Sequence, residues 1–454
     1  MKTTVDTWTR RRFLAASGVT AAGALAAGGA YSVQDLLGSA GRDGDGDSGA
    51  QGSRILVLVT LYGGNDGLNT LVPAGDSAYH DARPDLAYDE DEVLPLGDEL
   101  GLNPGLKGFK SLWDKDRLAV VRGVSYPQPD HSHFRSMAIW QTASPGTPAP
   151  SGWLGRWLDA QDDPDPLRAV SIGATLPPLL AGEKTAGAAV QLGGMRLPDA
   201  WRTVCSYLAE GHADDDHPLR RRAAESIGDL VTVTEAYGGQ DARDGQSAQD
   251  GKGARDRKDA QDGSDAQGES GDEEGPADPN DGEDEDRPTD GASAGGQSEL
   301  AAQLSVVARA LEANAPTRVH CVSLGGFDTH ANEKQTQSRL LGRLDHDIAD
   351  FLQRIRGTKA GSRVVVAVYS EFGRRVKANA NQGTDHGTAG PVFVLGEPVK
   401  GGFYGDQPSL TDLKDDDLRM TTDFRDVYAT LLERVLGTEP GRILGGHDRT
   451  LGFL

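Results

Sequence analysis

The sequence predicts an α/β protein built around a largely parallel sheet. Two observations carry this prediction. Short runs of apolar residues, such as residues 54–61 and 364–368, have the length and continuous hydrophobicity of strands that are buried on both faces. From Ser298 onward such runs alternate with longer segments whose apolar residues recur at helical spacing, and this alternation is typical of a parallel sheet with crossover helices.

The individual elements follow from the same two patterns. Apolar runs predict strands at residues 54–61, 116–124, 170–172, 318–324, 364–368 and 391–395. Helical spacing predicts helices at residues 134–140, 153–158, 196–208, 219–237, 300–311, 340–355 and 424–435. Asp130 or Ser132 is the expected cap of the helix at residues 134–140, because both side chains accept hydrogen bonds from a first helical turn.

A segment without apolar periodicity interrupts this order at residues 239–297. It contains 18 acidic and 6 basic residues, so it contributes −12 to the net charge of −23 of the 454-residue chain. We interpret it as a disordered acidic insertion within one α/β domain, whose two parts are residues 54–238 and 298–454. A solvated spacer is the favoured role, and a calcium-responsive or partner-binding role is the alternative. The negative charge argues against general nucleic-acid binding.

The N-terminus resembles a bacterial export signal. Arg10 and Arg11 lead into an apolar pair and an Ala/Gly-rich run, a pattern similar to the twin-arginine signal. We expect residues 1–40 to comprise the signal peptide and the start of a flexible tether, with cleavage between Ala26 and Ala40. The protein is then extracellular or associated with the cell envelope. Retention of the signal as a membrane anchor is the alternative.

Polar side chains gather where the predicted strands end. Glu371 and Arg374 follow the strand at residues 364–368, and Asp385 and His386 precede the next strand. The sequence places comparable groups, Asn65-Asp66, His131-Ser132-His133 and Asp328-Thr329-His330, after three other strands. Because parallel strands end at one edge of a sheet, we expect these groups to meet there. Carboxylate, imidazole and guanidinium groups together suit a metal ion and an anionic oxygen ligand.

Five motifs carry a resemblance to a known family. They are GGNDGLNTLVP at 63–73, HSHFRSMAIWQTA at 131–143, SLGGFDTH at 323–330, YSEFGR at 369–374 and TDHGTAGPVFVLG at 384–396. Together they resemble the exported family called domain of unknown function 1501, which in turn resembles the alkaline phosphatase and sulfatase superfamily. The resemblance covers nearly the whole chain after the signal except the acidic insertion. It implies an alkaline-phosphatase-like three-layer α/β/α fold with a largely parallel central sheet.

The resemblance also implies a metal-dependent hydrolase that acts on anionic phosphate or sulfate esters. It would hold one or two divalent cations, with Zn, Ca, Mg and Mn as alternatives. The implied metal ligands are Asp66, Asp328, His330, Glu371, Asp385 and His386. Of these, Asp328, His330 and His386 resemble the ligands of one metal and Glu371 that of a second, while Asp385 could instead orient His386.

The implied catalytic residues are Ser132 and Arg374. Ser132 is the best candidate for a nucleophilic hydroxyl at a helix N-terminus, with Thr70 as the second choice. Arg374 would hold a substrate oxyanion through paired hydrogen bonds. Two metals would lower the pKa of the nucleophile and neutralise charge on the attacking and leaving oxygens.

The chain departs from the superfamily pattern in two places. Glu371-Phe372 stands where the superfamily usually has Asp-His, and Asp328 and His330 are only two residues apart. A single metal or a harder ion is therefore an alternative to a two-zinc site. His131 and His133 are expected either to supply ligands or to serve in substrate contact or capping. The alternative function is a non-catalytic binding or assembly protein with a degenerate metal site.

Overall fold

The protein is a mixed sheet packed between two layers of helices. The computed structural model describes residues 30–31, 33–38, 54–146, 149–163, 165–192 and 298–454. The predicted signal sequence before Ala30, residues 39–53, the helices at 196–208 and 219–237 and the acidic insertion at 239–297 lie outside the described residues. Two described pieces of the segment that we expected to belong to the signal peptide and tether, Ala30–Tyr31 and Val33–Gly38, form strand β1 and helix α2.

The main sheet contains ten strands formed by the described residues, in the order β1-β8-β7-β9-β2-β10-β13-β6-β14, with β17 also paired to β6. Their bounds are β1 Ala30–Tyr31, β2 Ile55–Leu61, β6 Leu118–Ser125, β7 Ala169–Ile172, β8 Ala188–Val190, β9 Val319–Leu324, β10 Val364–Ser370, β13 Gly390–Leu395, β14 Gly402–Tyr404 and β17 Thr422–Asp423. The pairs from β1 to β10 are parallel, as are β14 and β17 with β6. Only β13 is antiparallel to its neighbours, β10 and β6. The predicted largely parallel sheet is confirmed.

Strand β13 runs the other way because no crossover helix precedes it. The chain leaves β10 through the hairpin of β11 (Arg374–Ala378) and β12 (Thr384–His386) and re-enters the sheet directly. A connection without a crossover element returns the chain antiparallel to the strand that it left. As a result, the polar loop between β10 and β13 stays at the edge where β10 ends.

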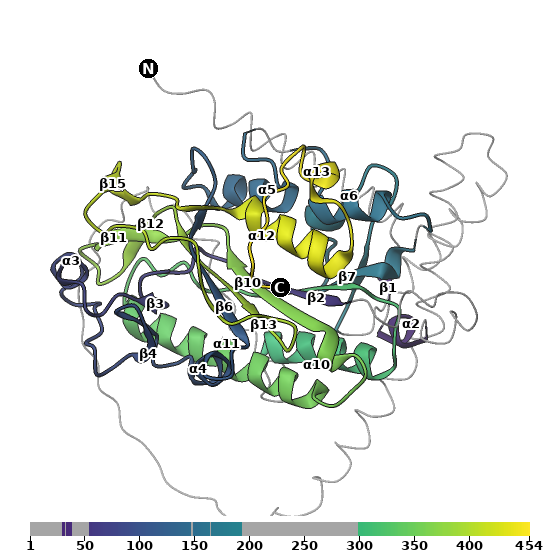
Figure 1. The fold of residues 1–454 in the computed structure, drawn as a ribbon, viewed down its shortest axis with the longest axis horizontal. Coiled ribbons are helices and arrows are strands. Elements are labelled where there is room, and N and C mark those ends of the chain that lie inside the picture. Colours follow the sequence, from purple (N-terminus) through teal and green to yellow (C-terminus); the bar gives the residue numbers. More distant parts are fainter. Residues whose placement is uncertain (1–29, 32, 39–53, 147–148, 164, 193–297) are drawn as a thin grey trace, which may run out of the picture.

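Each face of the sheet has its own helix layer (Figure 1). One layer contains α2 Val33–Gly38, α4 Lys107–Trp113, α10 Glu299–Glu312 and α11 Glu333–Ile355. The other contains α5 His133–Thr142, α6 Trp153–Asp159, α12 Phe424–Leu431, its π-helical continuation η6 Leu432–Leu436, and α13 Pro440–Ile443. Strand β2 shows why both layers are needed: Val57 and Val59 pack into the first core, and Leu56 and Leu58 into the second. The predicted three-layer arrangement is therefore confirmed.

Small elements complete the fold. They are the helix α3 Ser77–Ala82, the strands β3 Leu71–Val72, β4 Leu94–Gly97, β5 Leu100–Leu102, β15 Leu413–Lys414 and β16 Asp417–Leu418, and the 3-10 turns η3 Pro166–Arg168, η4 Pro178–Leu180 and η5 Gly361–Arg363. Together with β11 and β12, several of them enclose a third, smaller apolar cluster around Tyr79 and Val376. None of the helices formed by the described residues is long and apolar enough to cross a membrane.

Candidate metal centre

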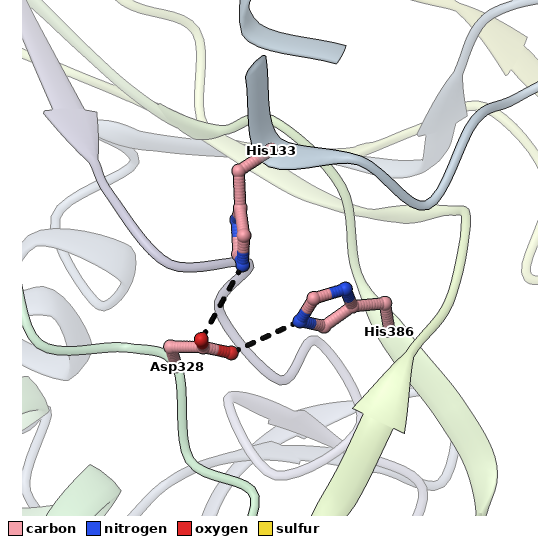
Figure 2. A group of neighbouring side chains, drawn as sticks. All are labelled: His133, Asp328 and His386. Carbon is pink, nitrogen blue, oxygen red and sulfur yellow. Dashed lines mark hydrogen bonds and ion pairs between the residues drawn. The ribbon is translucent and has the colours of Figure 1, made fainter. Parts of the chain in front are cut away.

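Three parallel strands deliver the centre of the site. After β2 the chain turns at Gly63, after β9 it reaches Asp328, and after β10 it reaches Glu371. Helix α5 adds His133 as its first residue, and strand β12 adds His386 as its last. Ligand atoms of His133, Asp328 and His386 lie within 4.8 Å of one another. The expected meeting of strand ends at one edge therefore occurs for this group (Figure 2).

Asp328 lies at the centre of the group. Its Oδ1 is 3.0 Å from His386 Nε2 and 3.1 Å from His330 Nε2, and its Oδ2 is 3.4 Å from His133 Nε2. The Nε2 atoms of His330 and His386 are themselves 3.0 Å apart. Ligand atoms of His133, Asp328 and His386 therefore face one small volume, and His330 lies beside it through its contacts with Asp328 and His386.

A hydrogen bond at the opposite nitrogen fixes the rings of His133 and His386, and a longer ion-pair contact lies behind the ring of His330. His133 Nδ1 is 2.8 Å from Glu371 Oε1, His386 Nδ1 is 2.8 Å from the carbonyl oxygen of His131, and His330 Nδ1 is 3.5 Å from Asp385 Oδ1. A carbonyl or carboxylate oxygen only accepts, so a neutral ring in this position carries its proton on Nδ1. The Nε2 atoms then present lone pairs to Asp328. Metal-bound histidines show this arrangement, in which an acceptor behind the ring sets its tautomer.

Without a cation, protons must balance this concentration of lone pairs. Burial lowers the pKa of His133, but its hydrogen bonds to Asp328 and Glu371 outweigh that effect and raise the pKa to about 9. Burial raises the pKa of Asp328, yet hydrogen bonds from His133, His386 and Arg374 hold it well below its usual range. Apart from its 3.4 Å contact with Asp328 Oδ2, the buried Nε2 of His133 has no hydrogen-bond partner among the described residues.

A divalent cation fits this donor set. The spacings of 3.0–3.4 Å between Asp328 and the three ring nitrogens are close to the roughly 3.3 Å that separates ligands of a tetrahedral zinc ion. Imidazole-rich sites with one carboxylate suit zinc better than calcium or magnesium, which prefer all-oxygen ligands.

Glu371 lies behind the ring of His133, on the side away from Asp328. Its side chain is 1% exposed, and its Oε1 accepts hydrogen bonds from the Gly63 N–H at 3.0 Å and from His133. Its Oε2 accepts the hydroxyl of Ser370 at 2.9 Å. Glu371 therefore orients His133 in this structure, whereas we expected it to be a metal ligand. Asp385 is 60% exposed and lies beside His330, whereas the orienting role that we considered for it was toward His386.

Arg374, which we expect to hold a substrate oxyanion, is surrounded by backbone carbonyls. The guanidinium is completely buried and donates to the carbonyl oxygens of Gly64 at 2.6 Å, Thr384 at 2.9 Å and Phe327 at 3.1 Å, as well as to Gly63 and Asp328. These bonds tie the ends of β2, β9 and β12 together. Because its donors are bound to these carbonyls and to Asp328, Arg374 holds the strand ends together in this structure, and its role toward a substrate stays a prediction.

Asp66 is outside the group. Its carboxylate is completely buried and forms a two-pronged ion pair with Arg83, in which Nη2 to Oδ1 is 3.0 Å, and it also accepts the Leu68 N–H at 3.2 Å. The structure does not bring it to Asp328. Arg83 gave no sequence signal, because it lies in an irregular loop after α3 and belongs to no strand-end pattern.

The two candidate nucleophiles are in very different surroundings. Ser132 is exposed, lies directly before α5 between His131 and His133, and its hydroxyl makes no capping hydrogen bond. Thr70 is buried, and its hydroxyl donates to the Asp66 carbonyl oxygen at 2.6 Å. Of the two, only Ser132 has an exposed side chain.

The comparisons with known proteins agree with the sequence motifs. The family described as "Protein of unknown function (DUF1501)" matches residues 53–450. This chain belongs to the DUF1501 family. The predicted family membership is therefore confirmed. No curated protein matches the chain.

Two solved structures resemble this DUF1501 protein over most of its length. A protein in the alkaline phosphatase superfamily from Vibrio parahaemolyticus shares 10% identity at a TM-score of 0.39, with 92% of this chain and 78% of that chain covered. The lipoteichoic acid synthase LtaP from Listeria monocytogenes shares 8% identity at a TM-score of 0.33, with 92% and 81% covered. Both likenesses are too distant to carry an argument about activity.

Proposed function

We propose that this protein is an exported metal-dependent hydrolase of phosphate or sulfate esters, with a single divalent cation held by His133, Asp328, His330 and His386. The observation that carries the proposal is the convergence of three Nε2 atoms on Asp328, with an oxygen acceptor hydrogen-bonded behind the rings of His133 and His386. Figure 2 shows His133 and His386 directed at Asp328. We propose zinc as the ion, because the set is rich in imidazole.

The residues around this centre suit an anionic ester. A bound divalent cation would polarise an ester oxygen and lower the pKa of a hydroxyl nucleophile. Ser132 offers such a hydroxyl at the N-terminus of the ten-residue helix α5, where the helix dipole favours negative charge. Its neighbour His131 has a side chain that is 42% exposed and held by Asp417 at 2.7 Å.

The decisive experiment measures metal content and turnover on the same preparations. We expect the purified protein to hold about one zinc per chain and to hydrolyse an aryl phosphate or an aryl sulfate. His386→Ala should lose the metal and the activity, whereas His346→Ala, which removes a histidine whose side chain is 73% exposed on α11, should lose neither. Ser132→Ala should keep the metal and lose at least about a hundredfold in kcat. Unchanged turnover would remove Ser132 as the nucleophile.

A binding or assembly protein with the same metal site is the second candidate. It is favoured by the placement of two residues expected to serve catalysis: Arg374 is occupied by backbone carbonyls and Asp66 by Arg83. Stoichiometric zinc without turnover of either ester would select this candidate. A protein that takes up no zinc would contradict the hydrolase and favour a binding or assembly protein whose metal site is degenerate.

A further inference from the structure

Two buried acids share one arginine beneath the hairpin of β11 and β12. Asp66, Arg83 and Glu333 are all 0% exposed. Glu333 is the first residue of α11, three positions after His330. The three charged groups would leave a buried net negative charge if both acids were ionised, and such a charge is costly away from water.

Arg83 has no donor left for Glu333. Its Nε donates to the Val376 carbonyl oxygen at 2.8 Å. Its Nη1 serves Asp66 and, at 3.1 Å, Asn69 Oδ1, while its Nη2 serves Asp66 at 3.0 Å and the Arg375 carbonyl oxygen at 2.7 Å. A guanidinium has five N–H groups, so this set uses all of them.

Glu333 therefore faces a hydrogen-bond acceptor, whereas an ionised carboxylate needs a hydrogen-bond donor. Its Oε2 accepts the hydroxyl of Thr384, whereas its Oε1 is buried without any donor among the described residues. The group that it faces is the carboxylate of Asp66, with which it is within hydrogen-bonding reach. Two carboxyl groups can share such a bond only when one of them carries a proton. Burial and the charge of Asp66 favour the proton on Glu333, and they raise its pKa to about 9.

We infer that Glu333 is a neutral carboxylic acid that donates to Asp66 and accepts from Thr384, and that it thereby positions the metal-binding strand β12. Thr384 begins β12 and His386 ends it. Arg83 holds the opposite strand, β11, through the carbonyls of Arg375 and Val376. The shared proton therefore joins both strands of the hairpin to the helix that follows His330. Only the effect on metal affinity rests on the proposed function.

Substitution by glutamine tests whether the side chain of Glu333 is neutral or ionised. Glu333→Gln keeps a donor for Asp66 and an acceptor for Thr384 without any titratable proton, and Glu333→Ala removes both. Glu299→Ala is the matched control, because Glu299 is also the first residue of a helix, α10, but is exposed. All four proteins are compared by zinc titration, by thermal unfolding and by infrared spectroscopy of protonated carboxyl groups.

We expect Glu333→Gln to bind zinc within about threefold of the wild type and Glu333→Ala to bind it at least about tenfold more weakly, as for the loss of groups that orient metal ligands. The wild-type infrared spectrum should contain a protonated carboxyl band that disappears in Glu333→Gln and persists in Glu299→Ala. If the band is absent, or if glutamine is as damaging as alanine, Glu333 is ionised and the inference is wrong. If the wild type binds no zinc, the proposed function fails, while the infrared and unfolding comparisons still decide the state of Glu333. If Glu333→Ala does not fold, the infrared band of the wild type and the measurements on Glu333→Gln still decide whether Glu333 is protonated.

Discussion

The burial of His320 predicts that the free energy of unfolding falls in acid. It lies in the middle of β9, where its neighbours in register are Val57 on β2 and Val170 on β7. The side chain is 0% exposed, and neither ring nitrogen has a hydrogen-bond partner among the described residues. Burial lowers the pKa of His320 to about 3. The folded protein therefore keeps this ring neutral well below the pH at which an unfolded chain protonates it.

The sign and size of the effect follow from this difference. Between the lowered folded pKa and the usual value of about 6.5, the unfolded state binds more protons, so the free energy of unfolding falls as the pH falls. A pH of about 4.5 is two units below the pKa of this ring in the unfolded chain. At 1.36 kcal/mol per unit, the free energy of unfolding at that pH is about 2.5 kcal/mol lower than at pH 7. This loss depends little on the pKa of His320 in the folded protein, provided that this pKa stays well below the lower of the two pH values.

The assay compares denaturant unfolding of the metal-free wild type and of His320→Leu at these two pH values. Leucine has a similar volume and removes two unpaired polar atoms, so the variant should be at least as stable at neutral pH. Its advantage should then widen by about 2.5 kcal/mol at the lower pH. His346→Leu, at an exposed site, controls for the loss of a histidine and should show no widening. Parallel loss of stability in the wild type and His320→Leu would mean that the ring is solvated or paired, and would refute the reasoning.

Two further predictions concern the strand ends and export. Arg374→Lys should destabilise the protein by about 3–5 kcal/mol in denaturant unfolding, because lysine cannot replace a planar guanidinium that binds several carbonyls. The control Arg375→Lys, at a side chain that is 37% exposed, should change the free energy of unfolding little. Equal stability of the two variants would contradict this assignment. Replacing Arg10 and Arg11 by lysine should leave the protein inside a bacterial cell that has a twin-arginine pathway, as judged by fractionation; continued export would exclude that route.

The layout of the sheet was predictable because it depends on patterns within short segments. Continuous apolar runs predicted β2, β9 and β10, and helical spacing predicted most of α10 and α11. The beginning of α11 was predicted too late. Its first two turns carry buried polar residues, Glu333 and Gln337, that bond to distant parts of the chain, and a hydrophobic pattern cannot reveal them.

The candidate site was predictable to the level of which residues reach the sheet edge, but their pairing was not. Asp328, His330 and His386 come together as the strand-end argument requires. His133 appeared in the sequence only as one of two alternatives, because a histidine at a helix start could equally be a cap.

Asp66 shows why pairing cannot be read from position along the chain. It follows a buried strand just as Asp328 does, and both therefore look like ligands in the sequence. The difference lies in how many oxygens a buried arginine occupies. Arg83 comes from a loop seventeen residues later and binds both oxygens of Asp66, whereas Arg374 binds only Oδ1 of Asp328, whose side chain is 47% exposed and whose Oδ2 faces His133. A carboxylate with both oxygens bound by a buried guanidinium would lose that pair on binding a cation, at a cost of several kcal/mol. The side chain that an acid meets in the folded protein, rather than its place after a strand, therefore decides whether it can bind a metal.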